Sequence, residues 1–311
     1  MRVLVTGGAG FIGSHVVAQA LSGGHEPSVL DNFSTGKREN VPPGVRVFEC
    51  DLRDREATAR AIREARPDVV SHQAAQASVP VSMKDPRLDA EVNLLGGLNL
   101  LEACRASQVK HVVFASTGGA IYGEVPEGER ADESSPCRPQ SPYGIHKLAF
   151  EQLLGVYASA YGLKSSVLRY ANVYGPRQDP HGEAGVVAIF FNQARAGRPL
   201  QIFSRRASKD GGCVRDYTFV ADVARANLLA MTGAVPHPLL NVASGQPTTT
   251  LELAQQILAL TGSTSPLVHA APRLGDIERS LLASQRFEQT LGTPTPLAVG
   301  LAETARYYLE Q

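Results

Sequence analysis

The sequence predicts an α/β protein with a doubly wound parallel sheet and a smaller, discontinuous C-terminal lobe. Three observations lead to this expectation. A glycine-rich turn joins an apolar, β-branched run at residues 1–6 to a helical stretch at residues 14–22. Strand-like and helix-like segments then alternate to about residue 161, as in parallel sheets with crossover helices. Beyond Tyr174, glycine, proline and polar residues break this alternation, which indicates a second lobe assembled from late segments.

The glycine-rich turn predicts a dinucleotide site. Gly7, Gly10 and Gly13 are spaced G-x-x-G-x-x-G between the first strand and the first helix. The first glycine suits a tight turn, the second lets a pyrophosphate approach the backbone, and the third lets the helix lie close to the strand. The unpaired N–H groups at the helix start favour phosphate. A Rossmann-type nucleotide domain is therefore expected.

A carboxylate follows the second strand in the position expected of a ribose ligand. The apolar run at residues 28–30 ends on Asp31, 18 residues after Gly13, close to where an acid can accept hydrogen bonds from a ribose diol. Because this charge would repel a 2′-phosphate, NAD is favoured over NADP. The alternative is an ordinary strand-end carboxylate. Asp51, after the third strand at residues 45–49, could face the adenine or cap the helix expected over residues 53–65.

The next strand, residues 67–72, is followed by small residues where a bound cofactor would pass. Ala74 and Ala75 suit close backbone approach, although a packing turn is the alternative. A long helical pattern then covers residues 86–107 and carries Asn93, which is expected either to face solvent or to turn inward toward the cofactor. Ligands of doubly wound sheets bind outside the carboxyl ends of the strands, so these positions are the candidates.

Hydroxyls and a tyrosine–lysine pair follow the strand at residues 110–115. Ser116 and Thr117 end that strand, and Tyr143 and Lys147 open a helix that extends to about residue 161. Residues four apart share a helix face. A lysine ammonium near the phenol favours the phenolate and lowers the pKa of the tyrosine, which makes it a usable base near neutral pH.

Composition excludes several classes of function. The 311 residues are 43% hydrophobic and 19% charged, with zero formal net charge, so nucleic acids and anionic membranes are poor partners. No apolar run approaches the ~20 residues of a membrane span, and the first residues form a strand, not a secretory signal. Four scattered cysteines without C-x-x-C predict reduced thiols in a cytoplasmic protein. The histidines show no spacing typical of metal ligands, so no metal site is predicted.

These motifs resemble the extended short-chain dehydrogenase/reductase family of NAD-dependent epimerases and dehydratases, and within it the members that epimerise UDP-glucose at C4. The resemblance covers essentially the whole chain. It is carried by T-G-G-A-G-F-I-G at 6–13, H-x-A-A at 72–75, S-T-G-G-A-I-Y-G at 116–123, the Tyr143/Lys147 pair, and the segments 169–176, 214–217 and 273–276. It implies an NAD-binding domain of residues 1–170 plus about 214–241. It also implies a nucleotide-sugar lobe of about 171–213 plus 242–311, and a homodimer.

The resemblance also implies roles for single residues. Tyr143 is the expected catalytic base, Lys147 its ribose-binding partner, and Thr117 the hydroxyl that bonds the sugar 4-oxygen, with Ser116 the weaker candidate for that role. The implied NAD-binding residues are Gly7, Gly10, Phe11, Ile12, Gly13, Asp31, Asn32, Asp51, Leu52, Gln73, Ala74, Ala75, Asn93, Ser116, Tyr143, Lys147 and Tyr170. The implied binding residues for a UDP-sugar substrate are Thr117, Tyr143, Asn172, Val187, Arg215, Arg273, Asp276 and Ser280.

The expected activity is inversion at C4 of a UDP-hexose, UDP-glucose or UDP-galactose, through a transient 4-keto intermediate. Dehydratases of the family carry an acidic pair directly after the catalytic threonine; Gly118 and Gly119 stand there in this chain and favour an epimerase. A decarboxylase, or an epimerase of a UDP-N-acetylhexosamine or a UDP-uronate, remains an alternative. The small Ser280, at a position that helps to gate sugar size, predicts tolerance of UDP-N-acetylglucosamine. A non-catalytic NAD sensor would have no need of the Thr117, Tyr143 and Lys147 set.

Overall fold

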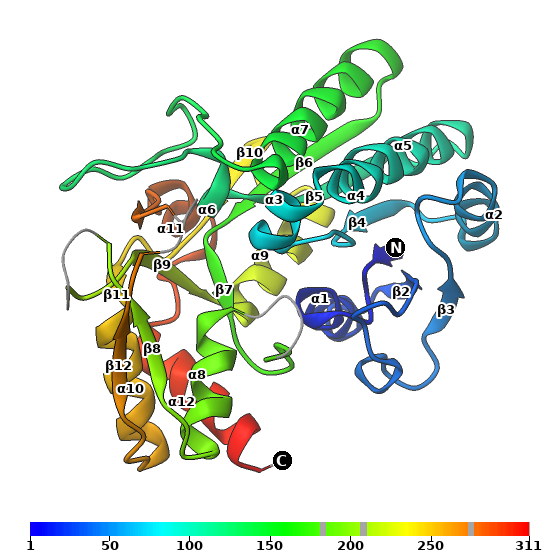
Figure 1. Ribbon diagram of the computed structural model, residues 1–311. Coiled ribbons are helices and arrows are strands. Elements are labelled where there is room, and N and C mark those ends of the chain that lie inside the picture. Colours follow the sequence, from blue (N-terminus) through cyan, green and yellow to red (C-terminus); the bar gives the residue numbers. More distant parts are fainter. Residues whose placement is uncertain (181–184, 206–209, 273–276, 311) are drawn as a thin grey trace. The chain divides into compact units, whose positions relative to one another are not determined.

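The computed structural model describes residues 1–180, 185–205, 210–272 and 277–310 (Figure 1). They form two compact units. Unit 1 comprises Met1–Thr117, Ser141–Arg169 and Val223–Leu240, and unit 2 comprises Gly118–Gln140, Tyr170–Asp222 and Asn241–Gln311. The boundaries differ from the expected ones in two places, because residues 118–140 and 214–222 belong to unit 2.

The reason for this difference is pairing that the local sequence does not reveal. Ala131 forms an isolated parallel bridge with Leu282, and Val125 N–H donates to the carbonyl of Arg279 at 3.1 Å. Residues 214–219 pair with three other strands of unit 2. Both segments are therefore held by late parts of the chain.

A seven-stranded sheet forms the centre of the fold. Its strands are β1 (Arg2–Thr6), β2 (Glu26–Asp31), β3 (Arg46–Glu49), β4 (Val69–His72), β5 (His111–Thr117), β6 (Lys164–Tyr170) and β10 (Leu239–Val242). Their order is β10-β6-β5-β4-β1-β2-β3. β1 pairs in parallel with β2 and with β4, so Thr6 lies between Leu30 and His72. The strand order reverses at β1, which makes the carboxyl ends of β1 and β4 the expected ligand crevice.

Both faces of the sheet in unit 1 carry helices, as a doubly wound fold requires. The helices are α1 (Phe11–Ser22), η1 (Arg38–Asn40), α2 (Arg55–Ala65), α3 (Val79–Lys84), α4 (Pro86–Ala90), η2 (Glu91–Gly96), α5 (Gly97–Ala106), α7 (Pro142–Tyr161) and α9 (Val220–Met231). Val70 packs in the core with α2, α5 and α7, whereas the hydroxyl of Ser71 bonds Asn227 of α9. Successive strand residues point to opposite faces, so these helices cover different sides.

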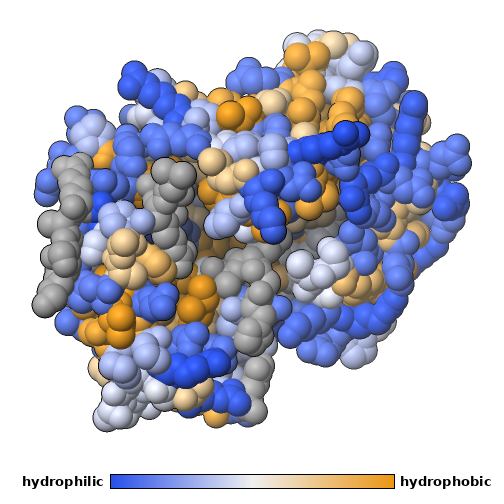
Figure 2. Space-filling model, in the orientation of Figure 1, coloured by the Kyte–Doolittle hydropathy of each residue, from blue (hydrophilic) through white to orange (hydrophobic). Residues whose placement is uncertain are grey.

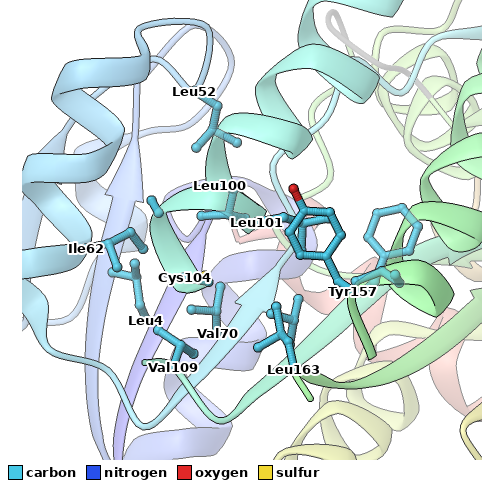
Figure 3. Packing of buried hydrophobic residues seen from close by; sticks show 14 of the residues in the cluster. Leu4, Leu52, Ile62, Val70, Leu100, Leu101, Cys104, Val109, Tyr157 and Leu163 are labelled. Atoms are coloured by element: carbon cyan, nitrogen blue, oxygen red, sulfur yellow. The ribbon is translucent and has the colours of Figure 1, made fainter. Parts of the chain in front are cut away.

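The core of unit 1 lies between β1, β4 and β5 on one side and α2, α5 and α7 on the other (Figure 3). Leu4, Val70, Leu100 and Leu101 are fully buried in it. The continuous apolar character of β1 fits a parallel strand covered on both faces. This packing fixes the position of α5 and α7 relative to the strands. It therefore also fixes which polar side chains of these helices lie beside the strand ends.

The helix expected over residues 86–107 is interrupted. It consists of α4, a π-helical turn at Glu91–Gly96, and α5. The prediction of a long helical segment is confirmed, and the π-turn within it was not foreseen, because the apolar spacing on either side of such a turn does not reveal it. Asn93 lies in this turn and is only 3% exposed.

Unit 2 contains two small sheets. β7 (Asn172–Tyr174), β9 (Val214–Phe219), β11 (Pro247–Thr249) and β13 (Arg279–Ser280) form one, and β8 (Leu200–Phe203) with β12 (Leu267–Ala270) forms the other. The helices are α6 (Gly118–Ile121), α8 (Val186–Arg195), α10 (Thr250–Thr261), α11 (Gln285–Leu291) and α12 (Leu297–Leu309). A capping box between Thr249 and Glu252 starts α10.

Within the described ranges, no helix has both the length and the hydropathy needed to span a bilayer. The same residues contain no group of three histidine, cysteine or acidic side chains arranged to hold a metal ion.

Candidate active site

The glycine turn is packed so closely that side chains cannot be added to it. Gly7 has a φ of +66°, and a Cβ there would lie 2.7 Å from the backbone nitrogen of Ala74. A Cβ on Gly13 would lie 2.0 Å from the carbonyl oxygen of Gly7. Helix α1 begins at Phe11 after Gly10, without a side-chain cap and without an acidic residue in its first turn. These features leave a positively polarised helix start facing a bare backbone turn, which suits a pyrophosphate.

Asp31 is fixed beside this turn. Its side chain is buried, and its two carboxylate oxygens accept the backbone N–H groups of Ala9 at 2.9 Å and Phe33 at 2.8 Å. Gly36 closes over it, because a Cβ there would lie 2.9 Å from a carboxylate oxygen. Each oxygen retains a lone pair for a ribose hydroxyl.

Asp51 forms a polar cluster with Asn32 and Arg53. Asn32 donates to one carboxylate oxygen at 3.0 Å, and the Arg53 guanidinium contacts both oxygens at 3.0 and 2.7 Å. The hydrogen bonds from Arg53 are the main reason that the pKa of Asp51 falls to about 2. The alternative that Asp51 caps the next helix was wrong, because α2 begins at Arg55 and its cap is Asp54. A cap three residues later frees Asp51 for the cluster.

A neutral histidine supports the loop after β4. The backbone N–H of Ala74 donates to the hydroxyl of Thr6 at 3.2 Å, and that hydroxyl lies 2.8 Å from Nδ1 of His72. The hydroxyl of Thr6 thus links the imidazole of His72 to the backbone of Ala74. Burial, with a smaller contribution from the charge of Lys147, lowers the pKa of His72 to about 3. The ring stays uncharged at neutral pH and orients the backbone of Ala74.

The remaining predicted residues of this loop are mostly occupied by bonds inside unit 1. The amide of Gln73 donates to Ser71 and to Asn227, each at 2.9 Å. Asn93 accepts from the backbone of Gln76 at 3.0 Å and donates to its carbonyl at 2.8 Å, so it faces inward and not solvent. Its described bonds support the loop after β4, and direct contact with the cofactor stays a prediction. Leu52 is buried, and Ala75 is half-buried.

The predicted base and its lysine lie together at the end of β5. Lys147 is 3% exposed, its Nζ donates to the carbonyl of Ala115 at 2.9 Å, and it lies 5.9 Å from the ring centroid of Tyr143. Tyr143 and Thr117 are each half-buried, so both side chains keep access to a ligand. The chain thus places a phenol, an ammonium and a strand-end hydroxyl in one unit. That set can remove and return a proton at a hydroxyl group.

Ser116 is not equivalent to Thr117. It is 3% exposed, and its hydroxyl donates to Glu151, which forms an ion pair with Arg169 at 2.6 Å. Sequence reasoning missed the Glu151–Arg169 pair and its link to Ser116. One signal was available, since Glu151 lies four residues beyond Lys147 on the same helix.

Three of the predicted substrate residues, Asn172, Arg215 and Ser280, lie on β9 or on strands that pair with it. Asn172 of β7 donates to the carbonyl of Asp216 at 3.2 Å, and Ser280 of β13 pairs in register with Arg215. Tyr170 and Val187 are buried. Arg273 and Asp276 lie outside the described residues.

Asp216 was not singled out from the sequence, although it organises this region. It is completely buried and accepts the backbone N–H and the hydroxyl of Ser244 at 2.9 and 2.6 Å, and the N–H of Gly245 at 2.9 Å. Burial raises the pKa of this carboxyl, and these hydrogen bonds oppose the rise. The one sequence signal for a role of Asp216 was an acidic residue directly after Arg215 in the same strand.

Comparison with known proteins identifies the family. The NAD dependent epimerase/dehydratase family is matched over residues 3–243. The chain belongs to this family. The UDP-glucose 4-epimerase of Mycolicibacterium smegmatis is 42% identical over 99% of this chain and 98% of that protein. The crystal structure of Thermus thermophilus UDP-glucose 4-epimerase in complex with NAD has a TM-score of 0.95, with 55% identity and 99% coverage of both chains. That of the Thermotoga maritima enzyme with UDP-glucose has a TM-score of 0.93, with 44% identity over 100% and 99% of the two chains.

Membership of this family makes NAD the cofactor, and unit 1 fits it. The bare backbone at Gly7, Gly10 and Gly13 and the uncapped start of α1 would hold the pyrophosphate, and Asp31 would accept hydrogen bonds from the adenosine ribose. A buried carboxylate at this place also disfavours a 2′-phosphate. Lys147 would reach the second ribose, beside Tyr143. The predictions of an α/β doubly wound fold, of this family and of NAD are confirmed.

Proposed function

We propose that this protein is an isomerase that interconverts UDP-glucose and UDP-galactose by inverting C4 of the hexose. The observation that carries the proposal is the Tyr143–Lys147 pair at the end of β5, in a unit whose glycine turn and Asp31 fit NAD. The named activity of its relatives, at 42–55% identity over nearly the whole chain, supports the same substrate.

The chain's own residues supply the proton chemistry. Tyr143, as phenolate, removes the proton of the 4-hydroxyl, either directly or through the hydroxyl of Thr117. The buried ammonium of Lys147 favours the phenolate by attraction across a short distance. NAD, when bound beside Tyr143 and Lys147, would supply the hydride acceptor for C4 and the hydride donor for the return step. After the 4-keto sugar has turned, Tyr143 would give the proton back to the 4-oxygen, and return of the hydride to the opposite face of C4 would invert its configuration.

The nucleotide part of the substrate is assigned to unit 2. Arg215 offers a forked donor to a diphosphate, and Asn172 lies on the neighbouring strand. Arg273 and Asp276 are proposed to complete the clamp, the arginine on the diphosphate and the aspartate on the uridine ribose. Firm binding of the remote UDP group retains the intermediate while the hexose ring is free to turn.

A steric observation favours an epimerase over a dehydratase. A Cβ on Gly118, directly after Thr117, would lie 2.3 Å from a methyl carbon of Leu282. The acidic residue that family dehydratases carry after their threonine would therefore require the side chain of Leu282 to shift. Ser280 is small and 2% exposed, and we keep the prediction that UDP-N-acetylglucosamine is also accepted.

We also propose a cytoplasmic homodimer. The four cysteines are free, as expected in a reducing compartment. Several apolar side chains of α3, η2 and α7 are exposed, and Figure 2 shows apolar side chains at the surface over α7. They are Val81, Met83, Leu95, Ile145 and Val156. A second copy of the chain would cover them.

The test is an NMR assay of the purified protein with UDP-glucose, with no NAD added, and with UDP-N-acetylglucosamine in parallel. Formation of UDP-galactose would establish C4 inversion and retained cofactor together. Conversion of UDP-glucose without conversion of the N-acetylated sugar would refute the role given to Ser280. An accumulating 4-keto sugar or a pentose would contradict the epimerase proposal and indicate a dehydratase or decarboxylase.

A further inference from the structure

One buried carboxylate joins three elements that meet beside the predicted catalytic residues. Glu151 of α7 and Arg169 of β6 have side chains that are 7% and 6% exposed. The Arg169 guanidinium donates to both carboxylate oxygens, at 3.0 and 2.6 Å. The hydroxyl of Ser116, near the end of β5, donates to the same carboxylate. Glu151 therefore connects α7 with the ends of two neighbouring strands.

The same helix grips β5 one turn earlier. Lys147 donates to the carbonyl of Ala115, and Glu151, four residues later, accepts from Ser116. Two consecutive residues of the strand are thus attached to two consecutive turns of the helix. The next residue of the strand is Thr117, and the helix carries Tyr143 one turn before Lys147. The attachment lies immediately beside the pair of groups whose separation decides proton transfer.

Stability does not by itself explain this pair. Removing two charges from water costs free energy that their attraction rarely exceeds, so a buried ion pair is often no more stabilising than apolar residues of similar size. The bidentate geometry between Glu151 and Arg169 does define position well, because two parallel hydrogen bonds leave little rotational freedom. What the pair provides is therefore a fixed geometry.

We propose that Glu151, held by Arg169, is a positioning residue for the reaction. It fixes the end of β5 against α7, so that the hydroxyl of Thr117 and the phenol of Tyr143 keep a constant separation throughout turnover. Glu151 does not touch the sugar or the cofactor in this role. The inference rests on the proposed epimerase function for its kinetic consequence, but its structural consequence, a rigid end of β5, is independent of the substrate.

The experiment compares three variants with one matched control. Glu151→Leu combined with Arg169→Leu removes both charges, so that no uncompensated charge stays buried and the protein folds. Glu151→Gln keeps the shape and removes one charge. Ser116→Ala cuts only the link from the pair to β5. The control is Glu64→Gln, which breaks the pair of an α2 glutamate with Arg46 of β3 at the surface, 2.8 Å apart and about half exposed.

We expect kcat for UDP-glucose to fall by about 100-fold in the double variant and in Glu151→Gln, because small displacements of reacting groups have effects of this size. For Ser116→Ala we expect kcat for UDP-glucose to fall by about tenfold. The KM for UDP-glucose, measured with saturating NAD, and the thermal midpoints of the double variant and of Ser116→Ala stay near those of the wild type. The amides of residues 116 and 117 exchange hydrogen faster in the NAD-loaded variants. Glu64→Gln changes none of these quantities.

A double variant with the kcat and amide exchange of the wild type would overturn the proposal and leave the pair a purely structural feature. A Ser116→Ala variant with unchanged kcat would overturn the link to β5. If the wild type fails to convert UDP-glucose, the proposed function fails. Amide exchange at residues 116 and 117 still decides the positioning role in that case, because it is measured without sugar.

Discussion

Individual side chains at the strand ends decide what this chain can do. The phenol of Tyr143 is useful only because Lys147 is held beside it by the carbonyl of Ala115, at 2.9 Å. The imidazole of His72 supports the loop after β4 only because its Nδ1 lies 2.8 Å from the hydroxyl of Thr6, which in turn accepts from the backbone of Ala74. Both pairs depend on burial, which strengthens polar interactions and penalises unpaired charge.

Replacing Tyr143 tests its proposed role as the catalytic base most directly. We expect Tyr143→Phe to lower kcat by about 10²- to 10⁴-fold, the range that a single general base contributes, while the variant still binds NAD. The measurement is turnover of UDP-glucose, together with the amount of NAD that copurifies. Tyr161→Phe, at the exposed end of the same helix, is the matched control and should keep full activity. Wild-type turnover in Tyr143→Phe would refute the assignment of the base.

His72 predicts a pH dependence of stability. Its pKa is about 3 in the folded protein and about 6.5 when unfolded, so the unfolded state binds a proton more readily below pH 6.5. The contribution to stability is complete above pH 6.5 and declines as the pH falls toward 3. Between pH 6.5 and 5 the expected loss is about 2 kcal/mol.

Urea unfolding of the wild type and of His72→Gln measures this loss, since glutamine keeps a hydrogen-bond acceptor but does not titrate. The free energy of unfolding of the wild type should fall by about 2 kcal/mol more than that of the variant over this pH range. Parallel declines in the two proteins would mean that the imidazole is not the group responsible.

Whole elements serve the site through close packing. α1 lies against the glycine turn, and the π-turn of η2 directs Asn93 toward the loop after β4. α7 carries the base, the lysine and Glu151 on one face at intervals of four residues. A regular helix in place of η2 would turn Asn93 away from Gln76, because one residue changes the direction of a side chain by about 100°.

Two glycine-to-alanine substitutions test the packing of helices, one at a glycine in close contact with other backbone and one at a glycine without close neighbours. Gly13→Ala should abolish NAD retention, because its methyl group would lie 2.0 Å from the carbonyl oxygen of Gly7 and displace the turn. Gly155→Ala should raise the free energy of unfolding by roughly 0.5–1 kcal/mol, since this exposed position within α7 has nothing within 4 Å. Cofactor content and urea unfolding are the measurements. Full NAD content in Gly13→Ala would refute the close packing of α1 on the turn.

For the whole molecule, the exposed apolar residues of α3, η2 and α7 predict self-association. We expect the wild type to sediment as a dimer and Val156→Glu to sediment as a monomer, because a buried unpaired carboxylate would weaken the dimer by at least about 100-fold. Val299→Glu is the control, since Val299 is a similarly exposed helical valine of α12, at 49% against 54%. A monomeric wild type at micromolar concentration, or equal behaviour of the two variants, would contradict the proposed interface.

Much of the fold and of the candidate site followed from local patterns. The turn at Gly7–Gly13, the acid at Asp31 and the Tyr143–Lys147 pair each depend on residues close in sequence or on strand ends, and the structure keeps each in the expected element. The alternative that Asp51 caps a helix was wrong, and the π-turn within the helical segment at 86–107 was not foreseen. Neither a cap nor a π-turn is distinguished by apolar spacing alone.

By itself, the sequence determined the doubly wound architecture, the family and NAD as the cofactor, because periodicity, glycine spacing and strand-end chemistry are local properties that can be read without knowledge of the neighbours. Only the tertiary structure decided which distant polar groups meet. Ser116 and Arg169 reach Glu151, and residues 118–140 join unit 2, only once the order and register of the strands are set. The physical reason is that buried polar groups must be paired, and in the fold their partners are chosen by proximity, not by sequence distance.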